Sequence, residues 1–171
     1  MSVTIRRMAA ADIDGVRQVA RTTWAQTYQG IIPEPVQAEF LSLAYSDGAL
    51  QRRMTQDVFL VAVRDGAIVG FADFQRTGPN LADLAAIYVL PAAQGAGVGS
   101  QLLTTGLRAL PDVRTLQLHV ERDNQIGRRF YAAKGFQISG ETTEQFAGHD
   151  LHTLKMTLHC PPRRTSGRTA R

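Results

Sequence analysis

The sequence predicts a mixed α/β domain whose central sheet is mostly antiparallel and flanked by helices. Apolar runs at residues 59–63 and 67–74 are joined by Asp65 and Gly66. A turn pair of this kind between two such runs is a strong hairpin signal, because both turn positions favour positive φ. Further along, the apolar period changes from strand to helix and back between residues 81 and 120, which predicts one parallel, right-handed crossover.

The chain ahead of this hairpin predicts one strand and three helices. Asp12 can cap the first helix, whose apolar residues recur at helical spacing and whose end is marked by Gly30 and Pro33. Ser46 or Asp47 can cap the third helix. The strand is expected at residues 3–7, and the two later helices at 35–44 and 46–54.

The chain after the hairpin predicts four strands and two helices, with clear end signals. Pro91 should end the first of these strands and Pro111 the first helix, because proline has no backbone N–H to donate. Gly135 stands where a left-handed helix cap is favoured, and Gly148 marks the turn of a final strand pair. The strands are expected at 81–90, 115–120, 136–145 and 151–158, and the helices at 98–110 and 124–134.

Length and charge predict one domain followed by a short tail. A chain of 171 residues with 44% hydrophobic residues can bury a substantial core, and we assign the domain to residues 1–160. The segment 161–171 has four arginines and no acid, so it accounts for the whole net charge of +4. We expect this basic tail to be disordered. Because residues 1–160 carry no net charge, nucleic acid is an unlikely partner.

Composition also bears on location and on metals. No stretch approaches the roughly 18 apolar residues of a membrane span, and the N-terminal residues have no apolar core of a secretory signal. Cys160 is the single cysteine, so no intramolecular disulfide can form. These observations predict a cytoplasmic protein without a membrane partner. The histidines near the last strand lack metal-ligand spacing, so no metal site is expected.

A glycine-rich loop between a predicted strand and a predicted helix is the most informative stretch. Residues 94–100 read Gln-Gly-Ala-Gly-Val-Gly-Ser. Such a loop can point backbone N–H groups into one concavity at a helix N-terminus, which binds phosphate or pyrophosphate. A P-loop would need a lysine after the last glycine, and a dinucleotide fingerprint would need glycine where Ser100 stands. The pattern that fits is Q-x-x-G-x-G, with Gln94, Gly97 and Gly99.

A second motif follows about 30 residues later. It has Asn124, then Tyr131 seven residues on, then a short run and Gly-Phe ending at Phe136. With the glycine loop, it makes the chain resemble the GNAT superfamily of N-acetyltransferases over roughly residues 3–158. The match departs from the family pattern at Gly127, where alanine is usual.

The resemblance implies acetyl-CoA as the acetyl donor and a role for each motif residue. The loop amides would hold the pyrophosphate, the strand at 87–89 would pair with the pantetheine arm, and the Val89 N–H would polarise the acetyl carbonyl. Asn124 would hold the cofactor arm, and Tyr131 would be the general acid that protonates the departing thiolate. The cofactor-binding residues expected on this basis are Ile87, Val89, Gln94, Gly95, Ala96, Gly97, Val98, Gly99, Ser100 and Asn124.

The general base is left open by the sequence. The acceptor amine must be neutral to attack, so a base or a desolvated site is needed. His119 lies five residues before Asn124, and Asp83 begins the strand that leads to Val89, both at positions where family members carry a base. A water chain without a dedicated base is the third option. Trp24 and Tyr28, in a segment that resembles a subset of the family, are the candidate substrate-binding residues.

The resulting functional prediction is acetyl transfer from acetyl-CoA to a primary amine of a small molecule or peptide by direct attack. The alternative is a non-catalytic acyl-CoA sensor that has kept the loop and lost turnover. Retention of both Asn124 and Tyr131 favours the enzyme. The acceptor and the oligomeric state stay open, a homodimer being common in proteins of this kind.

Overall fold

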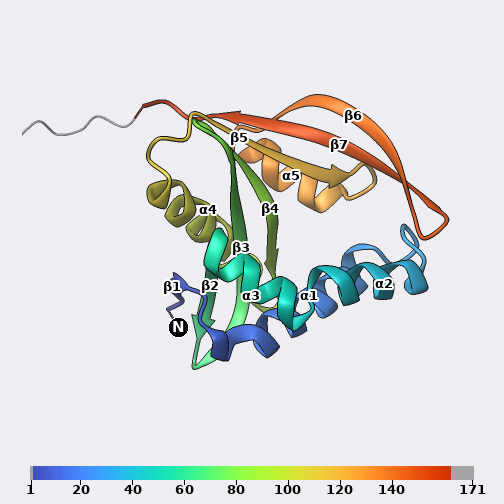
Figure 1. Cartoon of the computed structure of the whole chain (residues 1–171), viewed down its shortest axis with the longest axis horizontal. Helices are drawn as coiled ribbons and strands as arrows, with labels where there is room; N and C mark the ends of the chain where they lie inside the picture. The colour runs from blue at the N-terminus through green and yellow to red at the C-terminus, as the bar shows by residue number, and fades with distance from the viewer. Residues whose placement is uncertain (1, 163–171) are drawn as a thin grey trace, which may run out of the picture.

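The computed structural model describes residues 2–162 and has a seven-stranded sheet in the order β1-β2-β3-β4-β5-β7-β6 (Figure 1). Every neighbouring strand pair in it is antiparallel except β4 and β5, which are parallel. The predicted mixed, mostly antiparallel fold with one parallel strand–helix–strand unit is confirmed. The strands are β1 (Thr4–Arg7), β2 (Val58–Arg64), β3 (Ala67–Gly78), β4 (Leu81–Val89), β5 (Thr115–Glu121), β6 (Gln137–Phe146) and β7 (His149–His159).

Helices cover both faces of the sheet. Strand β2 alternates between them: Phe59 and Val61 pack with α1 and α3, whereas Leu60 and Ala62 pack with α4. This alternation buries both faces of the strand, as its continuous apolar run requires. Figure 1 shows α1, α2 and α3 together, apart from α4 and α5. The helices are α1 (Ile13–Thr27), α2 (Glu34–Ala44), α3 (Asp47–Gln56), α4 (Val98–Ala109) and α5 (Gln125–Ala133).

The predicted hairpin forms at the predicted turn. Asp65 and Gly66 have φ values of 51° and 77°, the left-handed conformation that the turn requires. Strand β3 runs four residues further than expected because Gln75 and Arg76 continue the ladder with β4 although they are polar and exposed. The apolar pattern ends at Phe74, so it could not reveal this extension.

The helix ends confirm one capping prediction and change another. The Ser46 Oγ accepts the Ala49 N–H at 3.1 Å and so caps α3. Asp12 stands at the start of α1 but accepts no N–H from that helix. Its carboxylate instead accepts the Ala9 N–H at 2.8 Å and two Arg6 guanidinium N–H groups at 2.7 and 3.0 Å, because a short 3-10 turn precedes α1.

The parallel pair β4–β5 is short, and this feature creates the site. Only residues 81–83 of β4 pair with β5, opposite Thr115 to Gln117. Beyond Asp83 the two strands have no pairing, and β5 continues along β7 instead. The sheet therefore opens toward the carboxyl end of β4, between its two halves.

The C-terminal part of the described chain is the hairpin β6–β7, whose turn has Ala147 and Gly148 in the left-handed region. No helix among residues 2–162 has the length and apolar character needed to cross a membrane. The predicted disordered tail, 161–171, lies outside the described residues from position 163 onward.

Candidate active site

A cleft of about 780 Å³ lies where β4 and β5 diverge. It brings together most of the residues predicted for the site. It does not include Asp83, Ala96 or Trp24. The predicted residues that line it are Tyr28, Ile87, Val89, Gln94, Gly95, Gly97, Val98, Gly99, Ser100, His119, Asn124 and Tyr131.

The backbone of β4 faces the cleft where β5 no longer pairs with it. The Leu90 N–H donates to the Val69 carbonyl on β3 at 2.8 Å, so Leu90 belongs to a hydrogen-bonded pair of that ladder. In an antiparallel ladder such pairs alternate with pairs whose N–H and C=O groups point to the other side. The register therefore turns Ile87 and Val89 toward the gap left by β5. The Val89 carbonyl there accepts the Gln94 side-chain amide at 3.0 Å.

A one-residue bulge in β4 decides which side chains reach each face. Phe74 pairs with Leu84 and Asp73 with Ala86, so Ala85 has no partner on β3. Leu84 packs in the cluster under α4, whereas Ala86 packs in the cluster under α1. Without the bulge, both residues would lie on one face. The bulge thus directs the Tyr88 ring toward α1, where it contacts the Phe71 ring with centroids 5.5 Å apart.

The glycine loop has the conformation that a phosphate cradle needs. Gly95 and Gly97 have φ values of 81° and 76°, and a Cβ on either would meet no protein atom within 4 Å. Gly97 is the N-cap of α4 and offers no side chain to the first N–H groups of that helix. These amides border the cleft at the positive end of the helix dipole, which favours an anion.

Helix α5 presents Asn124 and Tyr131 to the cleft. Asn124 is its N-cap, and its Oδ1 accepts the Gly127 N–H at 2.9 Å. The Tyr131 ring lies edge-on to Phe130 and Phe136, at centroid distances of 5.6 and 5.8 Å. Burial, and then the neighbouring Tyr88, raise the pKa of Tyr131 above its ordinary value. Its hydroxyl is therefore protonated at neutral pH and can donate a hydrogen bond into the cleft.

Tyr28 reaches the cleft from the opposite side, at the end of α1. It is 7% exposed and packs on the Trp24 ring at a centroid distance of 4.6 Å. Burial also raises the pKa of Tyr28, with smaller contributions from Tyr88 and Tyr131, while a hydrogen bond with Asn124 opposes the rise. Trp24 itself stacks on Phe40 and supports Tyr28 from behind, outside the cleft.

The two candidate bases differ in position. Strand β5 buries Leu118 and Val120 and turns His119, which is exposed, into the cleft from the other face. Asp83 lies opposite Gln117 in the paired part of β4–β5, before the strands separate. Among residues 2–162, no three His, Cys, Asp or Glu side chains are arranged to hold a metal ion.

Sequence reasoning missed several residues of the cleft wall. Tyr88 stands next to Ile87 and Val89 in the motif strand, but only the bulge explains why its ring lies near Tyr131 and Tyr28. Residues from the last turn of α1 and from α5 were also missed because their apolar pattern marks only their buried side. They are Thr23, Gln26, Thr27, Ile126 and Phe130.

Comparison with known proteins identifies the family. The sequence model of the acetyltransferase (GNAT) family matches residues 19–136, more than half of the chain, and the chain belongs to this family. Spermidine N(1)-acetyltransferase of Thermoplasma acidophilum is 27% identical over 154 residues, which cover 85% of this chain and 95% of that protein. An uncharacterised N-acetyltransferase of Mycobacterium tuberculosis is 31% identical over 143 residues, which cover 81% of this chain and 91% of that protein.

A solved structure supports the same assignment. The PaiA N-acetyltransferase of Thermoplasma acidophilum, crystallised in complex with coenzyme A, has a TM-score of 0.82 to this chain and is 26% identical to it. The match covers 94% of this chain and all of the other. The fold and family together define an acetyltransferase.

Proposed function

We propose that this acetyltransferase moves the acetyl group of acetyl-CoA to a primary amine of a small molecule or peptide by direct attack. The observation that carries the proposal is the opening between β4 and β5, where the backbone of Ile87 and Val89 faces a glycine cradle on one side and Tyr131 on the other. A thioester with a long amide-containing arm and a diphosphate fits this arrangement. The solved neighbour that contains coenzyme A supports the choice of donor.

The donor side of the cleft offers groups suited to each part of such a molecule. The open Cβ directions at Gly95 and Gly97 leave room for a diphosphate against the first amides of α4. Ile87 and Val89 can hydrogen-bond an extended amide arm as a strand would. The Val89 N–H is then available to stabilise negative charge on the acetyl oxygen.

The chemistry needs one new bond, one broken bond and two proton movements. The neutral amine nitrogen forms an N–C bond to the acetyl carbon, and the C–S bond breaks as the tetrahedral arrangement collapses. The nitrogen loses a proton to His119 or to water, and Tyr131 donates its proton to the leaving sulfur. Burial raises the pKa of Tyr131, so its hydroxyl holds its proton until the thiolate develops.

Of the two predicted bases, His119 is the one we propose. It lines the cleft on the side of α1, whereas Asp83 does not border it. An imidazole is also the side chain whose ordinary pKa lies nearest neutrality. The exposed position of His119 equally allows a water molecule to carry the proton onward to solvent.

The proposal is tested by measuring free thiol released from acetyl-CoA in the presence of a panel of amines. We expect release that depends on the amine, and a product heavier than the amine by one acetyl group. Binding of acetyl-CoA without release for any amine would instead indicate the sensor. Absence of any acetyl-CoA binding by calorimetry would overturn both readings.

A further inference from the structure

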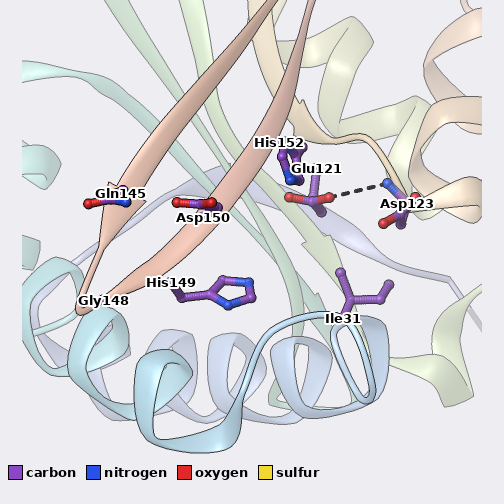
Figure 2. A pocket seen from close by; sticks show the side chains of 8 residues that line it. All are labelled: Ile31, Glu121, Asp123, Gln145, Gly148, His149, Asp150 and His152. Atoms are coloured by element: carbon purple, nitrogen blue, oxygen red, sulfur yellow. Dashed lines mark hydrogen bonds between the residues drawn. The ribbon is translucent and has the colours of Figure 1, made fainter.

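A second cavity, of about 450 Å³, shares Asp123 with the cleft and is open to solvent (Figure 2). The side chains of Glu121 and Asp150 also line it. None of the buried polar atoms that lack a partner among residues 2–162 borders this cavity. Carboxylates at an open surface are ordinarily solvated, and these three do not by themselves specify a ligand.

Gly70 on β3 lies directly behind the part of β4 that faces the cleft. It pairs with Val89, and the hydrogen bond from the Leu90 N–H to the Val69 carbonyl shows that the next pair along is hydrogen-bonded. Gly70 and Val89 therefore form a non-hydrogen-bonded pair, in which the two backbones approach most closely. Gly70 does not line the cleft, so it can affect a bound donor only through β4.

Strand β4 occupies the space that a side chain at position 70 would need. A Cβ on Gly70 would lie 2.9 Å from the Tyr88 carbonyl oxygen, 3.3 Å from the Val89 Cγ2 and 3.5 Å from the Val89 Cα. The first of these contacts is repulsive, because carbon and carbonyl oxygen atoms approach favourably only to about 3.3–3.6 Å. An added methyl group would therefore require the Tyr88 carbonyl to move by roughly 0.5 Å.

β4 is the strand that would have to move. Strand β3 is held on its far side by β2, whose Ala62 pairs with Gly70. Beyond Asp83, β4 has no strand on its cleft side, since its pairing with β5 ends there. The oxygen that the methyl group would meet belongs to the backbone, so it cannot turn away as the end of a flexible side chain could. The displacement would consequently carry β4 toward the cleft.

The peptide unit that would be displaced also carries the Val89 N–H. The Tyr88 carbonyl and the Val89 N–H are the two ends of one planar peptide, and in its trans form they point in opposite directions. The register directs the carbonyl toward β3 and the N–H toward the cleft. Because the unit is rigid, a movement of the oxygen is passed on to the N–H.

We infer that Gly70 is a positioning residue for acetyl transfer, since its missing side chain lets β4 lie where the Val89 N–H reaches the acetyl oxygen. This inference rests on the proposed function and adds a residue that acts on the donor through the backbone. An oxyanion donor works over a narrow range of about 2.7–3.1 Å, and loss of one lowers turnover about 10²- to 10³-fold. A displacement of roughly 0.5 Å should remove part of this effect, about ten- to a hundredfold.

The test compares Gly70→Ala with Gly78→Ala, using thiol release from acetyl-CoA with the best amine of the panel. Gly78 is the matched control, because it pairs with Leu81 at the far end of the same ladder and its Cβ would meet the Leu81 Cβ at an ordinary 3.4 Å. Gly70→Ala should lower kcat about ten- to a hundredfold and leave the dissociation constant of coenzyme A within about threefold. The control should match the wild type in both. An unchanged kcat in Gly70→Ala, or an equal loss of coenzyme A binding, would overturn the assignment.

A double variant separates movement of the peptide from crowding of the Val89 side chain. Val89→Ala removes the Cγ2 that would lie 3.3 Å from the new Cβ but leaves the Tyr88 carbonyl in its way. The kcat of Gly70→Ala/Val89→Ala should therefore stay about tenfold or more below that of Val89→Ala alone. With less crowding, the double variant also tests the inference should Gly70→Ala alone not fold. Recovery of kcat to the level of Val89→Ala would overturn the peptide route.

An infrared measurement tests the Val89 N–H directly and without turnover. The carbonyl stretch of acetyl-CoA, isotope-labelled at the carbonyl carbon, should fall on binding to the wild type and to Gly78→Ala, because a hydrogen bond to the oxygen weakens the C=O bond. In Gly70→Ala the stretch should return toward the value of free acetyl-CoA. An equal stretch in all three proteins would overturn the inference. Absence of thiol release with every amine would instead contradict acetyl transfer, and the stretch would still decide the role of Gly70.

Discussion

Gly127 lies so close to Asn124 that a Cβ on Gly127 would come within 2.6 Å of the Asn124 side-chain nitrogen. The amide of Asn124 therefore occupies the place of the alanine methyl group that is usual at this position. This contact links Gly127 and Asn124, two residues of the α5 motif that looked independent in the sequence. The missing methyl group allows Asn124 to cap α5 and to reach the Tyr28 hydroxyl.

Gly127→Ala should consequently lower activity although alanine favours a helix. Alanine gains up to about 1 kcal/mol of helix propensity over glycine, but displacement of the Asn124 cap costs about as much. We expect little change in stability and a fall in kcat/KM of about tenfold or more, because Asn124 is moved from the cleft. Gly48→Ala in α3 is the control, since its Cβ would meet only the end of Arg52 at 3.6 Å. Equal kinetics in both variants would contradict the prediction.

Tyr131→Phe should separate catalysis from binding. The substitution removes only the hydroxyl that donates to the leaving sulfur, and loss of a general acid lowers turnover about 10²- to 10⁴-fold. The dissociation constant for acetyl-CoA should stay within about twofold of wild type. Tyr45→Phe is the control, because Tyr45 is also buried but lies in the cluster under α1, outside the cleft. A parallel loss of binding and turnover would show that Tyr131 is not the acid.

Gly97→Val should abolish binding of coenzyme A. Valine is strained at a φ of 76°, and its side chain would fill the open space beside the first amides of α4. Gly66→Val carries the same strain, at a φ of 77° in the β2–β3 turn, without touching the cleft. Both variants should lose a similar amount of stability, about 1–2 kcal/mol. Calorimetry should find at least a hundredfold weaker binding of coenzyme A by Gly97→Val and unchanged binding by Gly66→Val. Unchanged affinity in Gly97→Val would refute the assignment of the loop to the diphosphate.

Asp73→Asn should remove a dependence of stability on pH. Asp73 is 1% exposed on β3, and its Oδ2 accepts the Arg53 Nε–H at 2.8 Å. Its Oδ1 and the Asp57 Oδ2 are both buried without a donor among the described residues. Burial, helped by the neighbouring Asp57 and opposed by Arg53, raises the pKa of Asp73 to about 7.

A carboxyl with a raised pKa stabilises the fold while it is protonated. This contribution is complete below the ordinary pKa of about 4 and is lost as pH rises through about 7. Between about pH 5 and about pH 8 the free energy of unfolding should fall by about 2–3 kcal/mol in the wild type. Asparagine is neutral and can donate to Asp57 at every pH, so the variant should show a flatter profile in urea unfolding. If the free energy of unfolding falls with pH equally steeply in both proteins, Asp73 is not the source of the pH dependence.

The fold was largely predictable because local patterns determine most of its elements. Apolar periodicity and turn residues such as Asp65, Gly66 and Gly135 placed the helices and strands to within a few residues. The Ala85 bulge could not be predicted, because its residues fit a regular strand as well as a bulged one. The bulge is a property of how β3 and β4 pair, and pairing depends on residues distant in the sequence.

The candidate site was predictable only where local sequence patterns form it. Its donor side is made of two contiguous motifs, so the loop around Gly97 and the helix with Tyr131 could be found from the sequence. The cavity beside it is lined by residues as far apart as Ile31, Glu121 and Asp150. Only the twist of the sheet and the docking of the β6–β7 hairpin bring them together, and no local pattern records that arrangement.

The short pairing of β4 with β5 has a mechanical consequence. Three residue pairs near Ala82 form the whole ladder between β4 and β5, so β4 beyond Asp83 has a free edge that faces the cleft. A donor bound along this edge would contact β4 on one side of the cleft and residues of β5 and α5 on the other. The bound donor should therefore reduce local opening at this edge. Amide hydrogen exchange in β5 should slow as the donor saturates the protein.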